Sequence, residues 1–125
     1  MKRRKISVLI VDDNSNFIKR MIGIIVELEN INFVHTASNY EEALNMLRRE
    51  HHDLVLLDIN LPSKSGIKLL EAIREASWNC KVVMLSNYSG DSYRQHCTGL
   101  GANYFLDKTI DFELVPDILN SIHPN

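Results

Sequence analysis

Two patterns of apolar residues alternate along the chain. Short apolar runs occupy residues 6–11, 32–37, 54–57, 82–85 and 104–106. Four of these runs are almost continuously apolar, which is typical of parallel strands that are buried on both faces of a sheet. The second run contains His35 and Thr36 and is more polar, so we expect it at an edge of the sheet.

The stretches between the runs carry apolar side chains three or four residues apart, which is the spacing of one face of a helix. These stripes are Phe17, Met21, Ile24, Ile25 and Leu28; Tyr40, Ala43, Leu44 and Leu47; Leu69, Leu70, Ile73 and Ala76; Tyr93, Cys97 and Leu100; and Phe112, Val115, Leu119 and Ile122. Ser38 followed by Glu41 has the pattern of a capping box, which predicts the start of the second helix. Pro116 removes one helical hydrogen bond, so we expect the last helix to begin late or to bend. His51 and His52 fall in a loop, where we expect them to be solvated.

Five strands that alternate with five helices predict an α/β fold, in which helices cover both faces of a parallel sheet. Right-handed crossovers make such a sheet doubly wound. Ligands bind at the carboxyl ends of its strands, near the point where the strand order reverses. We therefore expect the chemistry in the residues that directly follow each apolar run.

The composition agrees with one soluble domain. The chain has 125 residues, 45% hydrophobic and 24% charged, and this length can bury a core without disulfides. No apolar run approaches the roughly 18 residues that span a membrane, and the net charge of -2 gives no case for nucleic-acid binding. Cys80 and Cys97 form no CxxC motif, and we interpret them as small core residues in a reduced compartment. We expect a cytoplasmic protein with no membrane or nucleic-acid partner.

Residues with chemical function follow four of the runs. They are Asp12 and Asp13 after the first run, Asp58 after the third, Ser86 after the fourth, and Asp107 and Lys108 after the fifth. Two carboxylates about 4 Å apart repel by about 4 kcal/mol at an effective dielectric constant near 20, so a group of three needs a counter-charge. Mg²⁺ prefers such oxygen ligands, and together with a lysine it suits a phosphoryl group.

Taken in order, these residues resemble a known family. Val11-Asp12-Asp13, Asp58-Ile59-Asn60-Leu61-Pro62 followed by Gly66, Ser86 and Lys108 resemble the receiver domain of bacterial two-component response regulators, in its stand-alone, chemotaxis-regulator-like form. The resemblance covers essentially the whole chain. It implies a flavodoxin-like sheet with strand order 2-1-3-4-5, and a single receiver domain over residues 1–125 with no output domain.

The resemblance also implies a phosphoacceptor and a magnesium site. Asp58 would be the nucleophile that takes the phosphoryl group, from a histidine kinase or a histidine phosphotransfer protein. Asp13 and Asp58 would bind Mg²⁺ directly, Asp12 would hold it through water, and the main-chain carbonyl of Asn60 would be the remaining protein ligand. The protein would be a regulator that acts by binding an unknown downstream protein, and its only catalysis would be its own phosphorylation and dephosphorylation.

Ser86 and Lys108 would contact the phosphoryl oxygens, and Phe105 would occupy the position of the switch aromatic, usually a tyrosine. Two further positions depart from the family pattern. Thr109 stands where the family has a proline after a cis peptide, and because a cis bond to another residue costs about 2.5–4 kcal/mol, the geometry of the bond is open. After Ser86 comes Asn87, where the family favours a small residue, followed by Tyr88 at a position that affects phosphoryl lifetime.

Two other functions stay open from the residues alone. A phosphatase of the haloacid-dehalogenase type also uses an aspartate nucleophile, but it needs a second acid where this chain has Asn60. An inactive receiver-like binding module would have lost an acid or the lysine, and none is lost. Residues 111–125 contain no Lys or Arg, so we expect a monomer or weak dimer and not a charge-paired dimer.

Overall fold

The protein is an α/β domain built on one central sheet. We describe it from a computed structural model, which defines residues 4–87 and 91–124. In chain order the elements are β1 (Ile6–Val11), α1 (Ser15–Ile25), β2 (Ile31–Ala37), α2 (Tyr40–Arg49), β3 (Leu54–Asp58), α3 (Gly66–Glu75), β4 (Lys81–Ser86), α4 (Asp91–Gly99), β5 (Tyr104–Asp107), the 3₁₀ helix η1 (Phe112–Leu114) and α5 (Val115–Ser121). All the predicted strands are confirmed, each to within one residue at either end.

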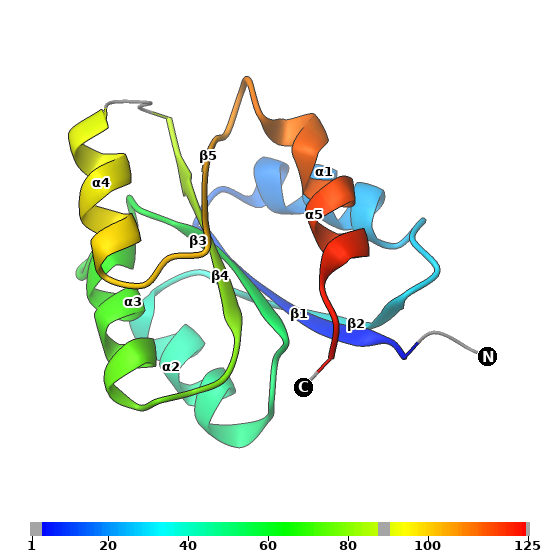
Figure 1. The fold of residues 1–125 in the computed structure, drawn as a ribbon, viewed down its shortest axis with the longest axis horizontal. Helices are drawn as coiled ribbons and strands as arrows, with labels where there is room; N and C mark the ends of the chain where they lie inside the picture. The colour runs from blue at the N-terminus through cyan, green and yellow to red at the C-terminus, as the bar shows by residue number, and fades with distance from the viewer. Residues whose placement is uncertain (1–3, 88–90, 125) are drawn as a thin grey trace.

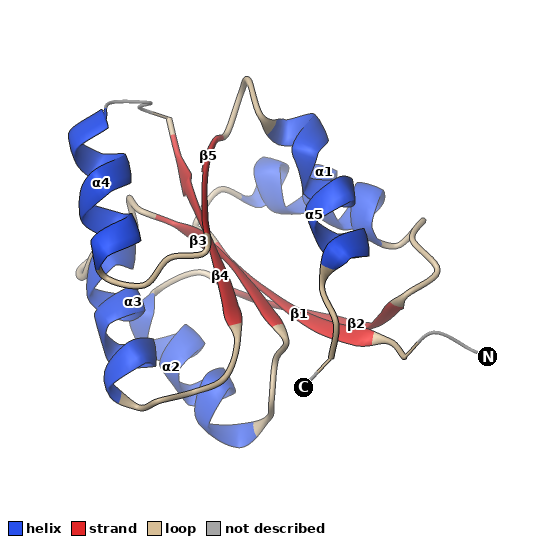
Figure 2. Cartoon of the chain, in the orientation of Figure 1, coloured by secondary structure: helices blue, strands red, loops and turns tan. Residues whose placement is uncertain are grey.

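The strands are parallel and lie in the order β2-β1-β3-β4-β5. The predicted doubly wound sheet and its strand order are therefore confirmed. Helices α1 and α5 cover one face, and α2, α3 and α4 cover the other (Figures 1 and 2). The more polar β2 lies at an edge of the sheet, as predicted, and most of its residues are partly exposed.

Two layers of core side chains lie on the two faces of the sheet. Alternate residues of a strand point to opposite faces, so Val8 of β1 packs against α1 and α5, whereas Leu9 packs on the other side. In β5, Phe105 belongs to the α2–α4 layer and Leu106 to the α1–α5 layer. This arrangement explains why the strands other than β2 are almost continuously apolar, since both of their faces are buried.

The ends of two helices test the sequence predictions. The capping box predicted from Ser38 and Glu41 is wrong by one residue: Asn39 is the cap, and its Oδ1 accepts a hydrogen bond from the Glu42 backbone N–H at 2.9 Å. Serine and asparagine cap helices about equally well, so the spacing alone did not choose between them. The late start of the last helix is confirmed, because α5 begins at Val115 with Pro116 in its first turn, after η1.

Cys80 and Cys97 are both buried in the α2–α4 layer, as predicted, and burial raises the pKa of each thiol. Among the helices of residues 4–87 and 91–124, none combines the length and the apolar character that a membrane span requires.

Candidate functional site

The register of the sheet brings the predicted site residues to one edge. Val11 pairs with Leu57, so the residues that follow them, Asp12 and Asp58, stand side by side. Asp58 in turn pairs with Leu85, which places Ser86 just beyond it. Ser86 pairs with Asp107, and its carbonyl accepts a hydrogen bond from the backbone N–H of the next residue on that chain, Lys108, at 2.9 Å.

Alternation along the strands explains which of these side chains meet. Asp12, Asp58 and Lys108 each stand two residues after a member of the α1–α5 layer; those members are Ile10, Leu56 and Leu106. The three side chains therefore turn to the same face of the sheet. Lys108 Nζ lies 2.6 Å from Asp12 Oδ2 and 3.5 Å from Asp58 Oδ2, and all three side chains are at most 9% exposed.

Asp13 completes a group of three carboxylates, which we call the acid cluster: Asp12, Asp13 and Asp58. One oxygen from each lies within 4.8 Å of the others. Asp13 is exposed, whereas Asp12 and Asp58 are buried. The cluster therefore opens to solvent on one side and faces Lys108 on another.

The electrostatics of Asp58 follow from this environment. Burial, and next the neighbouring charge of Asp12, raise the pKa of Asp58 from 3.8 to about 6. Lys108 and the backbone N–H of Asn60, which donates to Asp58 Oδ1 at 3.2 Å, lower the pKa in part. Asp58 is thus mostly ionised at neutral pH, but at a cost that a further positive charge would relieve.

The loops after β1 and β3 hold the acids in place. Asp12 Oδ1 accepts a hydrogen bond from the Asn14 backbone N–H at 2.8 Å, and Asn14 is itself the N-cap of α1. After β3, the chain turns so tightly that a Cβ on Gly66 would lie 2.0 Å from the Asp58 carbonyl oxygen. Glycine at this position lets α3 begin directly against the end of β3.

A further aspartate at this edge has a structural role. Asp107 Oδ1 accepts hydrogen bonds from the backbone N–H groups of Thr109 at 2.7 Å and Ile110 at 2.9 Å, and Asp111 Oδ2 accepts one from the Asp107 N–H at 2.9 Å. These bonds hold the loop that carries Lys108. The Lys108–Thr109 peptide bond is trans.

Phe105 is buried, and only 5% of it is exposed. The guanidinium carbon of Arg94, from α4, lies 5.1 Å from the centre of the Phe105 ring, and Arg94 Nη1 donates to the Phe105 carbonyl at 3.1 Å. Arg94 is a residue that the sequence pattern does not single out. It stands three residues before Cys97, a core position of its amphipathic helix. At that position the sequence does not distinguish a cation that packs on an aromatic ring from a solvated one.

Of the two residues after Ser86, the structure describes the first, Asn87. Asn87 is exposed at the end of β4, so its larger side chain points into solvent and not into the core. Tyr88 lies outside the described residues.

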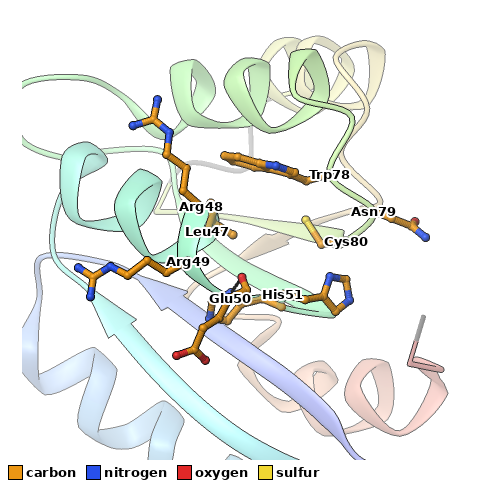
Figure 3. Close-up of a pocket in the computed structure, with 9 residues that line it drawn as sticks. Leu47, Arg48, Arg49, Glu50, His51, Trp78, Asn79 and Cys80 are labelled. Atoms are coloured by element: carbon orange, nitrogen blue, oxygen red, sulfur yellow. Dashed lines mark hydrogen bonds between the residues drawn. The ribbon is translucent and has the colours of Figure 1, made fainter.

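The opposite end of the sheet carries a second polar region. Here a hollow lies between the C-terminus of α2 and the loop before β4, with Glu50, His51 and Trp78 around it (Figure 3). The prediction that both histidines are solvated is wrong for His52, which is 2% exposed. Its Nε2 lies 3.1 Å from Nδ1 of His35 in the edge strand β2, a neighbour that the loop sequence could not reveal. This hollow lies at the amino ends of the strands, away from the acid cluster.

The acid cluster fits a hard divalent cation. Its converging oxygens come from two buried carboxylates and one exposed carboxylate. Burial, and next the charge of Asp12, raise the pKa of Asp58, and Lys108 offsets this rise only in part. Carboxylate oxygens that leave room for water are the ligands that Mg²⁺ prefers in proteins. The structure thus brings together an acid cluster, a lysine and a strand-end serine in a doubly wound α/β protein.

Comparisons with known proteins agree with this class. The model of the response regulator receiver domain matches residues 8–120. The chain therefore belongs to the response regulator receiver domain family, and the resemblance seen in the sequence is confirmed. A receiver domain is a signalling regulator and not a conventional enzyme.

Solved structures give the same result. The chain is 30% identical to a chain of the CheX–CheY complex with BeF3 and magnesium from Borrelia burgdorferi, covering 92% of this chain and 90% of that one, with a TM-score of 0.78. It is 25% identical to the phosphorylated cyanobacterial phytochrome response regulator RcpA, covering 92% and 89%, with a TM-score of 0.80. The receiver domain of the Francisella response regulator 1452 shares the fold, with a TM-score of 0.85 at 22% identity over 93% and 94% of the chains.

Proposed function

We propose that the protein is a phosphorylation-dependent switch whose phosphoacceptor is Asp58. The observation that carries this proposal is the buried Asp58 carboxylate, which has a raised pKa of about 6 and lies 3.5 Å from Lys108 beside two further acids. The donor is a phosphohistidine of a histidine kinase or a histidine phosphotransfer protein.

The reaction is an in-line displacement at phosphorus. A carboxylate oxygen of Asp58 attacks phosphorus, the bond from phosphorus to the donor imidazole nitrogen breaks, and the electron pair returns to the imidazole. The product is an acyl phosphate on Asp58. Lys108 and Ser86 bind the phosphoryl oxygens, so charge that develops during transfer meets preorganised donors.

Asp13, Asp58 and the main-chain carbonyl of Asn60 would hold Mg²⁺ directly, and Asp12 would hold it through water. When bound, the ion supplies positive charge for the phosphoryl oxygens. Within the site, the chain's own residues separate two tasks: the acids position the cation, and Lys108 screens Asp58 from Asp12.

The output of the switch is protein binding. The Borrelia burgdorferi relative is a complex of two proteins, which supports a protein partner for this chain too. Phosphorylation adds a net charge of about -1 to -2 at the site at neutral pH. Ser86 lies at the end of β4 and Phe105 lies in the neighbouring strand β5, and both are buried, so a movement of Ser86 toward the phosphoryl group would change the packing around Phe105.

Intact mass spectrometry after incubation with acetyl phosphate and Mg²⁺ tests the proposal. Wild type should gain one phosphoryl group, and Asp58→Asn should gain none. Asp117→Asn, the same chemical change on α5, is the matched control and should react like wild type. A phosphoryl group on Asp58→Asn at wild-type yield would refute the assignment. Continuous turnover of added phosphate monoesters would instead indicate a phosphatase.

A further inference from the structure

The ring of Phe17, in α1, covers the ammonium group of Lys108. Lys108 Nζ lies 4.4 Å from the centre of the ring, and Phe17 is 7% exposed. The same nitrogen lies 2.6 Å from an Asp12 oxygen. The ammonium is therefore largely dehydrated, with a carboxylate on one side and an aromatic face on another. A cation over an aromatic face is attracted by the ring quadrupole, and more strongly when it is desolvated.

A closed ring of contacts fixes the position of Phe17. The Phe17 backbone N–H donates to the Asn14 side chain at 3.1 Å, as part of the N-cap of α1. The Asn14 backbone N–H donates to Asp12 Oδ1 at 2.8 Å, and Asp12 Oδ2 binds Lys108. The first turn of α1 is thus tied to the acid that pairs with the lysine, and it presents the ring to the same lysine.

The Phe17 ring also packs against a second aromatic ring. Phe112 of η1 meets Phe17 edge-on, with the ring centres 5.8 Å apart and the planes at 79°. The guanidinium carbon of Arg20 lies 4.5 Å from the centre of the Phe112 ring. Phe17 can therefore not turn away from Lys108 without disturbing its packing against η1.

We propose that Phe17 is a positioning residue for phosphoryl transfer, holding the Lys108 ammonium beside Asp58 through the face of its ring. This inference rests on the proposed function of Asp58. A lysine is a compact charge on a flexible four-carbon stem, so its position must come from its neighbours. Asp12 is one such neighbour, but in the proposed function it also serves the cation. The ring attracts the ammonium without neutralising it, so the full charge stays available to phosphoryl oxygens.

Fluorination of the ring separates this attraction from packing. Mono-, di- and trifluorophenylalanine at position 17 progressively withdraw electron density from the ring face while its size hardly changes. The rate constant for phosphorylation of the full chain by acetyl phosphate with Mg²⁺ should fall with each fluorine. The total loss should be roughly three- to tenfold, the range that a partly desolvated cation–π contact allows.

The matched control places the same residues at position 112. Phe112 shares the packing of Phe17 but not its contact with the ammonium, so fluorination there should leave the rate constant unchanged. A flat series at position 17, or an equal decline at both positions, would overturn the proposal.

An NMR measurement tests the contact without any phosphorylation. In wild type the Hε protons of Lys108 should be shifted upfield by the Phe17 ring current. Phe17→Leu should abolish that shift, and Phe112→Leu should keep it. Hε resonances of Lys108 at ordinary lysine positions in wild type would overturn the inference. If the shift is present but Asp58→Asn is phosphorylated like wild type, then Asp58 is not the phosphoacceptor. The contact between Phe17 and Lys108 would then stand, but its role in phosphoryl transfer to Asp58 would be refuted.

Discussion

Replacing Asp58 with asparagine is expected to stabilise the protein in the absence of divalent cations. The substitution keeps the size and shape of the side chain but removes its charge. In the fold this carboxyl is buried beside Asp12, and its pKa rises from 3.8 to about 6. The acid is therefore harder to ionise in the folded protein than in the unfolded chain, and its ionisation opposes folding.

The magnitude and the pH range follow from that pKa. At 1.36 kcal/mol per pKa unit, the rise from 3.8 to about 6 corresponds to about 3 kcal/mol. The pKa of Asp58 is higher in the folded protein than in the unfolded chain. Its contribution to the free energy of unfolding is therefore fully present below about pH 4 and is lost as the pH rises through about 6. The advantage of Asp58→Asn should thus grow by about 3 kcal/mol between about pH 4 and pH 7.

Urea denaturation in EDTA over this pH range measures the difference. With a slope of about 2 kcal/mol per molar urea, the expected gain is a shift of roughly 1.5 M in the midpoint. Glu75→Gln, on the exposed end of α3, is the matched control and should show no such pH-dependent gain. Millimolar Mg²⁺ should stabilise wild type by mass action and Asp58→Asn much less. A difference that stays constant from about pH 4 to pH 7 would refute the electrostatic reasoning.

Three further predictions concern other parts of the molecule. Burial, and then His35, lower the pKa of His52 below 6.5, so His52 favours its neutral form and its contribution to stability is lost as the pH falls below about 6.5. His52→Gln should therefore lose less stability than wild type between about pH 7 and pH 5 in urea titrations, and an equal loss would contradict this. Arg94→Ala should remove about 0.5–1 kcal/mol of attraction between the guanidinium and the Phe105 ring. The Phe105 ring resonances should then broaden or shift in NMR spectra, whereas an unchanged ring spectrum would show that Arg94 does not hold the ring. Because residues 111–125 carry no Lys or Arg, sedimentation of the phosphorylated protein should show a monomer or a weak dimer that is insensitive to salt; a tight dimer that salt dissociates would exclude this.

Much of the fold could be predicted because most of the strands are buried on both faces, the edge strand β2 being the exception. Continuous apolar runs then mark the strands directly, and polar residues stand out where the runs end. Asp58 and Lys108 were predictable for this reason, although they lie 50 residues apart in the sequence. That they lie close together in space follows from the register of the sheet. Register is strongly specified where the faces of the strands are buried.

What could not be predicted depends on how helices and edge strands approach one another. The alternation of β5 puts Lys108 on the same face as α1, yet only the docking of α1 decides that Phe17 and not Met21 meets the ammonium. His52 was predicted to be solvated because it falls in a loop between a helix and a strand. In the fold it lies against Phe33 and His35 of the edge strand, and such contacts between distant parts of the chain leave no local pattern.

The alternation within β5 has a mechanical consequence. Phe105 packs into one core layer, Leu106 packs into the other, and Lys108 stands at the end of the same strand. A small displacement of this edge strand along its axis would act on α4 through Phe105 and Arg94, and on α1 through Lys108 and Phe17. Displacement of β5 would therefore be transmitted to both faces of the sheet. Reporter groups on α1 and on α4 would then detect the same displacement at the same time, from opposite sides of the molecule.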